Sequence, residues 1–277
     1  CVMRRDYELL KSVLSVPSKT YQEEQMVEFI TNWLSENNIP FFVDGMSNIY
    51  ATKQTNENIE YFPCVVAHTD TVHNIDTINI REGLLPNAQN ELKPSLKAYN
   101  DKGNPTGIGG DDKCGIYACL ELLKELPNLK AAFFVSEETG CHGSRKADKT
   151  FFTNVGYAIQ FDAPGNWMVS EFCMGVQLFD RDTEFFTSCD EVLTEGFEKR
   201  QKYQSHPYTD VYALKQLFDF SCINFAIGYY KYHTPNEYVV IEDVYSGIEI
   251  GKKMIEKLGY TKHSFTPKPK NSYTLFD

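Results

Sequence analysis

The spacing of apolar residues along the chain predicts helices that alternate with strands. Between residues 7 and 34, apolar positions recur at helical intervals around a break at Pro17 and Ser18, which predicts two helices in tandem. Residues 41–52 and 61–67 are predicted to be strands. The second of these is a continuous apolar run, as in a strand buried on both faces of a parallel sheet.

The rest of the chain continues this alternation. Further predicted elements are a helix at residues 116–126, strands at 131–135, 155–161 and 222–228, and a closing helix at 241–258. Residues 73–106 are rich in Asn, Pro, Gly and Lys and are predicted to form a long irregular excursion, of a length that loops usually reach for functional reasons. We therefore predict an α/β fold: a three-layer sandwich of a mostly parallel, twisted sheet with helices on both faces.

The composition is that of an ordinary globular protein. With 277 residues, of which 42% are hydrophobic and 23% charged, the chain is neither disordered nor fibrous and can bury a core of its own. No internal repeat or linker divides it. We expect one domain over residues 1–277, with residues 262–277 as a loosely attached C-terminal tail.

Charge and cysteine content exclude some partners and compartments. A formal net charge of −11 repels phosphate backbones and anionic lipid, so neither nucleic acid nor a membrane is expected as a partner. The same sign is usual for soluble proteins and selects no function. The 8 cysteines form no CxxC pair and are expected to be reduced, mostly buried thiols. With no membrane-spanning run or signal-peptide core we expect a cytoplasmic protein, although the start at Cys1 leaves a removed N-terminal segment open.

Polar residues follow the predicted strands at the points where those strands end. Four such clusters are VVAHTD (65–70), FFVSEETG (133–140), YAIQFDAPG (157–165) and YYKYHTPNE (229–237). A fifth, TGIGGDDKCG (106–115), places two acids on a glycine-rich loop before a helix. In open α/β sheets, ligands bind in the crevice outside the carboxyl ends of the strands. Residues far apart in sequence are therefore expected to converge there.

The residues in these clusters suit a pair of metal ions. Two imidazoles and several carboxylates are ligands of a borderline divalent ion such as zinc, and one carboxylate can bridge two ions. A metal pair roughly 3.5 to 4 Å apart lowers the pKa of a bridging water and stabilises the oxyanion of a tetrahedral intermediate. A further carboxylate outside the ligand set can act as general base and pass the proton to the leaving amine. Such a combination hydrolyses amides.

Each cluster taken alone also has a purely structural interpretation. His68 could be a satisfied histidine in a turn, and Glu137 with Glu138 a solvated pair. Asp162 could open an ordinary turn, and His233 could cap the next one. These interpretations do not predict the order of the clusters or their shared placement at strand ends.

The order of these clusters resembles that of the co-catalytic dizinc peptidases, the group of peptidase T, the aminoacylases and the zinc aminopeptidases. In this chain the order is HTD, GIGGDDKCG, SEETG, FDAPG and KYHTPNE. The pattern of that family is HxD, a glycine-rich loop with DD or DN, EE, a lone acid and a late His. The match spans residues 68–233. The resemblance implies a zinc-exopeptidase-like catalytic domain that holds two Zn²⁺ ions, with Co²⁺ or Mn²⁺ as alternatives.

The resemblance also implies a role for each matching residue. Asp111 would bridge both metals. His68 and Asp162 would complete one metal site, and Glu138 and His233 the other.

The remaining acids of these motifs would not bind metal. Asp70 would orient His68 through the ring nitrogen that is not bound to metal. Glu137 would be the general acid/base, and Asp112 would be a structural neighbour without a ligand role.

The chain departs from the peptidase T and aminoacylase pattern, which inserts a lid domain between the lone acid and the late histidine. The stretch from Asp162 to His233 is too short for a domain of ~100 residues, so we expect a catalytic domain without a lid. That is the normal state of the aminopeptidase branch, which EETGCHGS (137–144) also resembles. His206 and Asp210 are candidates for a substrate-facing loop, against the commoner alternative of a polar turn, and substrate-binding residues are otherwise unassigned.

We expect a zinc-dependent exopeptidase that releases an N-terminal residue or cleaves di- or tripeptides. Two alternatives stay open: an amidohydrolase of N-acyl amino acids that uses the same metals, and a non-catalytic binding module on the same fold. The presence of Glu137 beside the full ligand set argues against the last. Side-chain preference, the metal used in the cell and the oligomeric state are not indicated by the sequence.

Overall fold

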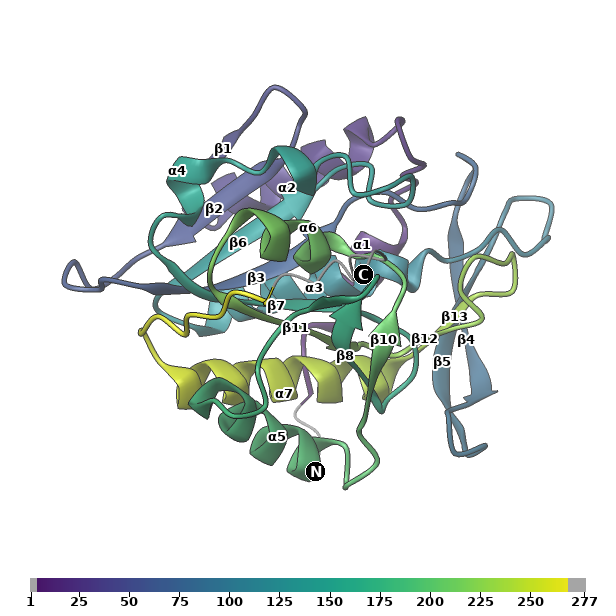
Figure 1. Cartoon of the computed structure of the whole chain (residues 1–277). Coiled ribbons are helices and arrows are strands. Elements are labelled where there is room, and N and C mark those ends of the chain that lie inside the picture. The colour runs from purple at the N-terminus through teal and green to yellow at the C-terminus, as the bar shows by residue number, and fades with distance from the viewer. Residues whose placement is uncertain (1–3, 269–277) are drawn as a thin grey trace, which may run out of the picture.

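The central element of the fold is a nine-stranded sheet, seen in a computed structural model that describes residues 4–268 (Figure 1). Its strand order is β1-β2-β6-β3-β7-β11-β8-β10, and β9 pairs with β8. The strands are β1 (Phe41–Val43), β2 (Ile49–Lys53), β3 (Phe62–His68), β6 (Leu129–Phe134), β7 (Val155–Ala163), β8 (Met168–Cys173), β9 (Val176–Gln177), β10 (Lys202–His206) and β11 (Ser221–Ala226).

The four middle strands β6, β3, β7 and β11 are mutually parallel. β2 and β8 run antiparallel to this group on its two sides, and β10 is parallel to β8. Every residue of β3, β6 and β11 is buried, because these strands are covered on both faces, as their continuous apolar runs predict.

Helices cover both faces of this sheet (Figure 1). α3 and α7 pack together on one face, with α1 against α3 and α5 against α7, while α6 packs on β3, β7 and β11 from the other face. The predicted α/β sandwich with a mostly parallel sheet is thus confirmed. The helices are α1 (Tyr7–Leu14), α2 (Glu24–Glu36), α3 (Gly110–Glu125), α4 (Lys149–Phe152), α5 (Glu184–Gly196), α6 (Asp210–Leu217) and α7 (Ile241–Leu258), with a 3₁₀ turn at Ser144–Lys146.

A second, four-stranded antiparallel sheet stands at one side of the molecule (Figure 1). Its order is β12-β13-β5-β4, with β4 (Asn79–Pro86), β5 (Leu92–Tyr99), β12 (Tyr229–Tyr230) and β13 (Tyr238–Val240). The prediction of an irregular excursion at residues 73–106 is therefore wrong in its middle, where β4 and β5 form a hairpin. Most of β4 is exposed and β5 buries only part of its length, so a polar composition concealed these strands.

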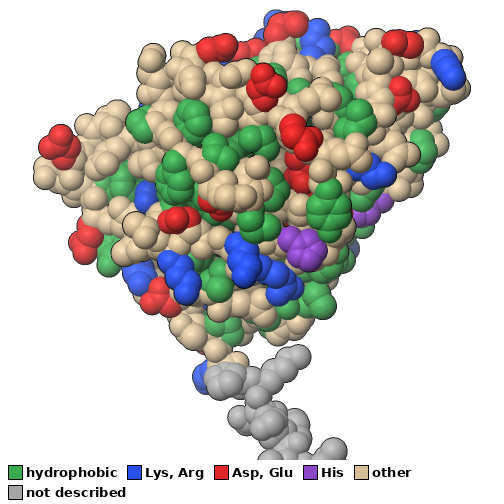
Figure 2. Space-filling model, turned by 90° about the horizontal axis from the view of Figure 1, so that it is seen from above, with side chains coloured by type: hydrophobic (Ala, Val, Ile, Leu, Met, Phe, Trp, Pro, Cys, Tyr) green, Lys and Arg blue, Asp and Glu red, His purple; other side chains and the backbone are tan. Residues whose placement is uncertain are grey.

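The surface and the chain ends add three observations. Figure 2 shows a face on which acidic side chains are scattered while several Lys and Arg side chains lie together. The start of the expected tail is hydrogen-bonded to β11 and to the residues before it. Ser221 N–H donates to the His263 carbonyl, and Phe265 N–H donates to the Asp219 carbonyl. The rest of the expected tail, residues 269–277, lies outside the described residues. No helix within residues 4–268 has the length and apolar character needed to cross a membrane.

Candidate metal centre and active site

His68 is the last residue of β3 and is completely buried. Its Nδ1 lies 2.9 Å from the Asp70 carbonyl oxygen and 3.1 Å from Asp70 Oδ1, so Asp70 fixes the ring orientation. Asp70 is itself held in place, because its carboxylate accepts hydrogen bonds from the Thr20 hydroxyl and from the N–H groups of Glu137 and Glu138. The opposite nitrogen, Nε2, therefore points at the other carboxylates of the centre.

Asp111 lies between the two histidines. One of its oxygens, Oδ1, is 3.0 Å from His68 Nε2, and the other, Oδ2, is 3.0 Å from His233 Nε2. The glycine-rich loop brings it there: Gly109 has φ 68°, and a Cβ at that residue would come within 2.8 Å of a Thr71 methyl group. A single carboxylate thus faces two imidazoles that are far apart in sequence.

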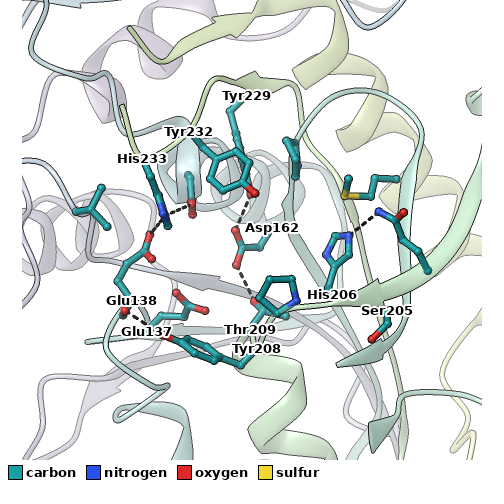
Figure 3. Close-up of a pocket in the computed structure, with 16 residues that line it drawn as sticks. Glu137, Glu138, Asp162, Ser205, His206, Tyr208, Thr209, Tyr229, Tyr232 and His233 are labelled. Atoms are coloured by element: carbon teal, nitrogen blue, oxygen red, sulfur yellow. Dashed lines mark hydrogen bonds and ion pairs between the residues drawn. The ribbon is translucent and has the colours of Figure 1, made fainter. Parts of the chain in front are cut away.

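The five predicted ligands and Glu137 form three overlapping groups, and within each group one potential donor atom per residue lies within 4.8 Å of the others. The groups are His68 with Asp111 and Asp162, His68 with Glu137 and Glu138, and Asp111 with Glu138 and His233. His233 also lies 3.0 Å from Glu138 Oε1. A possible metal site is therefore present at the carboxyl ends of β3 and β7 (Figure 3).

Asp162 is positioned by two hydroxyl groups that the sequence analysis did not identify. Tyr229 Oη donates to one of its oxygens at 3.0 Å, and Thr209 Oγ1 donates to the other at 2.7 Å (Figure 3). Tyr229 begins the YYKYHTPNE cluster and Thr209 precedes Asp210, but nothing in the sequence marks either hydroxyl as a partner of Asp162. Asp112, in contrast, is buried beside the centre, where it accepts from the His68 N–H and is absent from the donor groups.

The carboxylates of this centre raise the pKa values of its two histidines. Burial lowers the pKa of His68. The carboxylates of Glu137 and Asp162 and hydrogen bonding to Asp111 raise it by more, so the pKa of His68 lies well above its usual range. Hydrogen bonds to Asp111 and Glu138 raise the pKa of His233 to about 10. Since bound metals require neutral imidazoles, cation binding here would release protons.

The two adjacent glutamates also titrate unusually. Burial raises the pKa of Glu138 to about 7, and nearby Asp111 raises it too. Burial and the Asp162 charge raise the pKa of Glu137 well above its usual range, against the opposing effect of His68. Perturbed carboxylates of this kind gather at sites that transfer protons.

A cavity of about 570 Å³ opens over the cluster. Figure 3 shows Glu137, Glu138 and His233 on one side of it and His206 on the other. Of the two candidates for a substrate-facing loop, His206 lines the cavity, whereas Asp210 is buried below it and accepts hydrogen bonds from Ser144 and Gln160. The other residues that line the cavity include Val72, Pro164, Met168, Gln204, Ser205, Pro207, Tyr208 and Tyr232.

Glu237 is a third residue that sequence reasoning missed, although it ends the KYHTPNE motif. It is fully buried, and its carboxylate accepts from the N–H groups of Gly109 and Asp111, each at 3.0 Å, and contacts His73 Nε2 at 2.6 Å. Glu237 therefore ties the loop that carries Asp111 to the loop that carries His233. Its place in that motif, four residues after His233, could have drawn attention to the residue, whereas its contacts could not be predicted from the motif.

Comparison with known proteins places this geometry in context. No family model matches the chain. A curated relative, the cytosol non-specific dipeptidase of Escherichia coli (strain K12), is 23% identical over 187 residues, which cover 66% of this chain but only 35% of that protein. The chain thus spans about a third of the length of this relative.

Solved structures match over nearly the whole chain. The aminopeptidase PepT of Bacillus cereus ATCC 10987 has a TM-score of 0.74 at 13% identity and covers 91% of this chain and 97% of its own. A tripeptidase of Staphylococcus aureus subsp. aureus Mu50 has a TM-score of 0.67 at 12% identity over 90% of this chain and 97% of its own. The relative and these two structures are named as peptidases, so the resemblance to that group is confirmed at the level of the fold. At these identities the likeness establishes the fold.

Proposed function

We propose that this chain is a metal-dependent exopeptidase that holds two divalent cations, Zn²⁺ before Co²⁺ or Mn²⁺, and hydrolyses the N-terminal bond of peptides or cleaves di- and tripeptides. The observation that carries the proposal is the position of Asp111, with one oxygen 3.0 Å from each imidazole. A carboxylate placed in this way is suited to bridge two ions. The peptidase activity in the names of its relatives supports the same reading.

The donor set fits zinc. Imidazole nitrogens and carboxylate oxygens are its usual ligands outside cysteine-rich sites, and the groups gathered here are of these types. We assign His68 and Asp162 to one ion and Glu138 and His233 to the other, with Asp111 between them. When bound, two such cations would polarise the scissile carbonyl and lower the pKa of a water molecule.

The chain's own residues supply the proton transfer and the support. Glu137 would take a proton from the attacking water and deliver it to the departing amine, a role that suits a carboxylate whose pKa burial has raised. Asp70 holds the ring of His68, and the hydroxyls of Tyr229 and Thr209 hold both oxygens of Asp162. These contacts fix the ligands before substrate binds.

The lining of the cavity favours a substrate with a free amine over an N-acyl amino acid. Among its lining residues there are four acids but no lysine or arginine. An acyl amino acid lacks the free α-amino group of a peptide, whereas the carboxylate next to its scissile bond is one that a dipeptide carries as well, so the amine is the group that distinguishes the two substrates. A protonated α-amino group would be attracted by the acidic groups beside the metals.

Two expectations from the sequence stay within this proposal. We infer a catalytic domain without an inserted lid, since the residues between Asp162 and His233 form β8, β9, α5, β10, α6, β11 and β12. We also infer a cytoplasmic location, which the name of the E. coli relative supports.

The test combines metal analysis with a substrate panel. Protein prepared without chelator should contain about two zinc ions per chain and cleave free-amine peptides, lose activity with a chelator, and regain it with zinc or cobalt. Absence of metal together with no gain on adding zinc would contradict the proposal. Turnover of N-acyl amino acids alone would replace the exopeptidase with a deacylase, and metal binding without turnover would favour a binding module.

A further inference from the structure

The wall of the cavity opposite the metal centre is formed by β10. Gln204, Ser205 and His206 all line the cavity, and although the register with β8 shifts between Gln204 and Ser205, the Gln204 side-chain nitrogen lies 3.1 Å from His206 Nε2. Lys202 precedes Gln204 by two residues, and its register partner on β8, Met168, also lines the cavity. His206, Gln204 and Lys202 therefore form a row along β10 that runs from the cavity toward the start of the strand. In Figure 3, His206 lies across the cavity from Glu138 and His233.

The row ends at a small basic hollow. This hollow, of about 310 Å³, is lined by Gln89, Trp167, Lys199, Arg200, Gln201 and Lys202. Trp167 and Lys202 line the hollow, and Met168, which follows Trp167 and is the register partner of Lys202, lines the main cavity, so the two are bordered by adjacent residues. Of its three cations, only Arg200 is ion-paired within residues 4–268, to Glu198 at 3.0 Å. In a chain of net charge −11, this is a local reversal of sign beside an acidic site.

The backbone of β10 has a free edge. β10 is the last strand of the sheet, and no strand within residues 4–268 pairs with its outer side. Lys202 N–H and the His206 carbonyl bond toward β8, so the alternation of a strand turns the backbone groups of Tyr203 and Ser205 outward. Extended peptides bind such edges by adding a strand.

We propose that β10 binds the leaving part of an extended peptide substrate and that Lys202, Lys199 and Arg200 bind its C-terminal carboxylate. This inference rests on the proposed function, since it places the scissile bond at the metal centre. Lys202 and His206 are four residues apart, about 13 Å at ~3.3 Å per residue. The ligand class is therefore a peptide with a free carboxylate about four or five residues beyond the scissile bond. Di- and tripeptides would not reach Lys202.

Equilibrium binding tests this without turnover. The metal-free chain is titrated calorimetrically with the hexapeptide Leu-Ala-Gly-Ser-Gly-Ala as the free acid and as the C-terminal amide. We expect the acid to bind about tenfold tighter than the amide, and Lys202→Gln to remove that difference. The matched control is Lys253→Gln, an exposed lysine on α7 outside the hollow, which should bind as the unaltered chain does.

Kinetics on the metal-loaded chain complete the test. Lys202→Gln should raise KM for the hexapeptide by about tenfold at unchanged kcat and leave tripeptide cleavage unaltered. Equal binding of acid and amide, or equal effects of Lys202→Gln and Lys253→Gln, would overturn the inference. If the difference between acid and amide appears but no peptide is cleaved, the proposed function fails while the carboxylate site stands. If short peptides are cleaved and neither length nor amidation matters, only this inference fails.

Discussion

The two walls of the cavity are built in opposite ways. The metal-side wall comes from the ends of parallel strands in the middle of the sheet, where His68 and Asp70 are fully buried and Asp70 contacts the ring of His68 and accepts from the Glu137 N–H. The opposite wall is β10, an edge strand with Lys202 and Ser205 exposed. A buried, over-determined wall keeps reacting groups in place, whereas an edge strand leaves backbone and side chains available to a variable ligand.

The largest expected effect comes from removing the proton carrier of the buried wall. Glu137→Gln keeps the shape of the side chain but removes its basicity, so hydrolysis should fall by ~10² to 10⁴-fold or more while metal content stays unchanged. Peptide turnover and metal analysis on the same preparation measure both. An undiminished rate would remove Glu137 from the assigned role.

A pair of histidines compares the two walls directly. His233→Ala removes a donor that lies 3.0 Å from both Asp111 and Glu138, so one of the two metals should be lost and activity should drop more than the roughly 10- to 100-fold typical of residues that only orient a ligand. His206→Ala should retain both metals and alter mainly KM. Equal metal loss in both variants would erase the distinction between the walls.

A substitution at Glu237 tests whether the residue that holds the loop of Asp111 affects metal affinity. Glu237→Gln replaces an acceptor of two backbone N–H groups by an amide that can accept with only one oxygen, so the loop of Asp111 should loosen. We expect metal affinity to fall about 10- to 100-fold in a competition assay with a chromophoric chelator. Asn236→Ala, at the adjacent position, is the control and should leave affinity unchanged. Retained affinity in Glu237→Gln would make that residue merely structural.

The smallest effect is expected at Tyr229. Tyr229→Phe removes one of the two hydroxyl groups that hold Asp162, a loss of about 0.5–1.5 kcal/mol for a single hydrogen bond. Metal affinity should therefore fall by no more than about tenfold, as measured in the same competition assay. A loss as large as that of His233→Ala would mean that Tyr229 does more than position the carboxylate.

The two walls also differ in how far the sequence predicted them. β3 and β6 are buried on both faces, so they appear as continuous apolar runs, and the polar residues after them stand out. β10 has the sequence KYQSH, which carries no apolar run, because an edge strand needs none. The hairpin of β4 and β5 escaped prediction for a similar reason, since β4 buries none of its residues fully. Supporting contacts such as those of Glu237 and Tyr229 depend on tertiary placement, which no local pattern encodes.

The most direct test of the account is a crystal of the chain grown with zinc and measured at the zinc absorption edge. We expect two anomalous peaks roughly 3.5 to 4 Å apart, one among His68, Asp162 and Asp111 and the other among Asp111, Glu138 and His233. No peak at this place, or His68 and His233 directed into separate pockets, would contradict it.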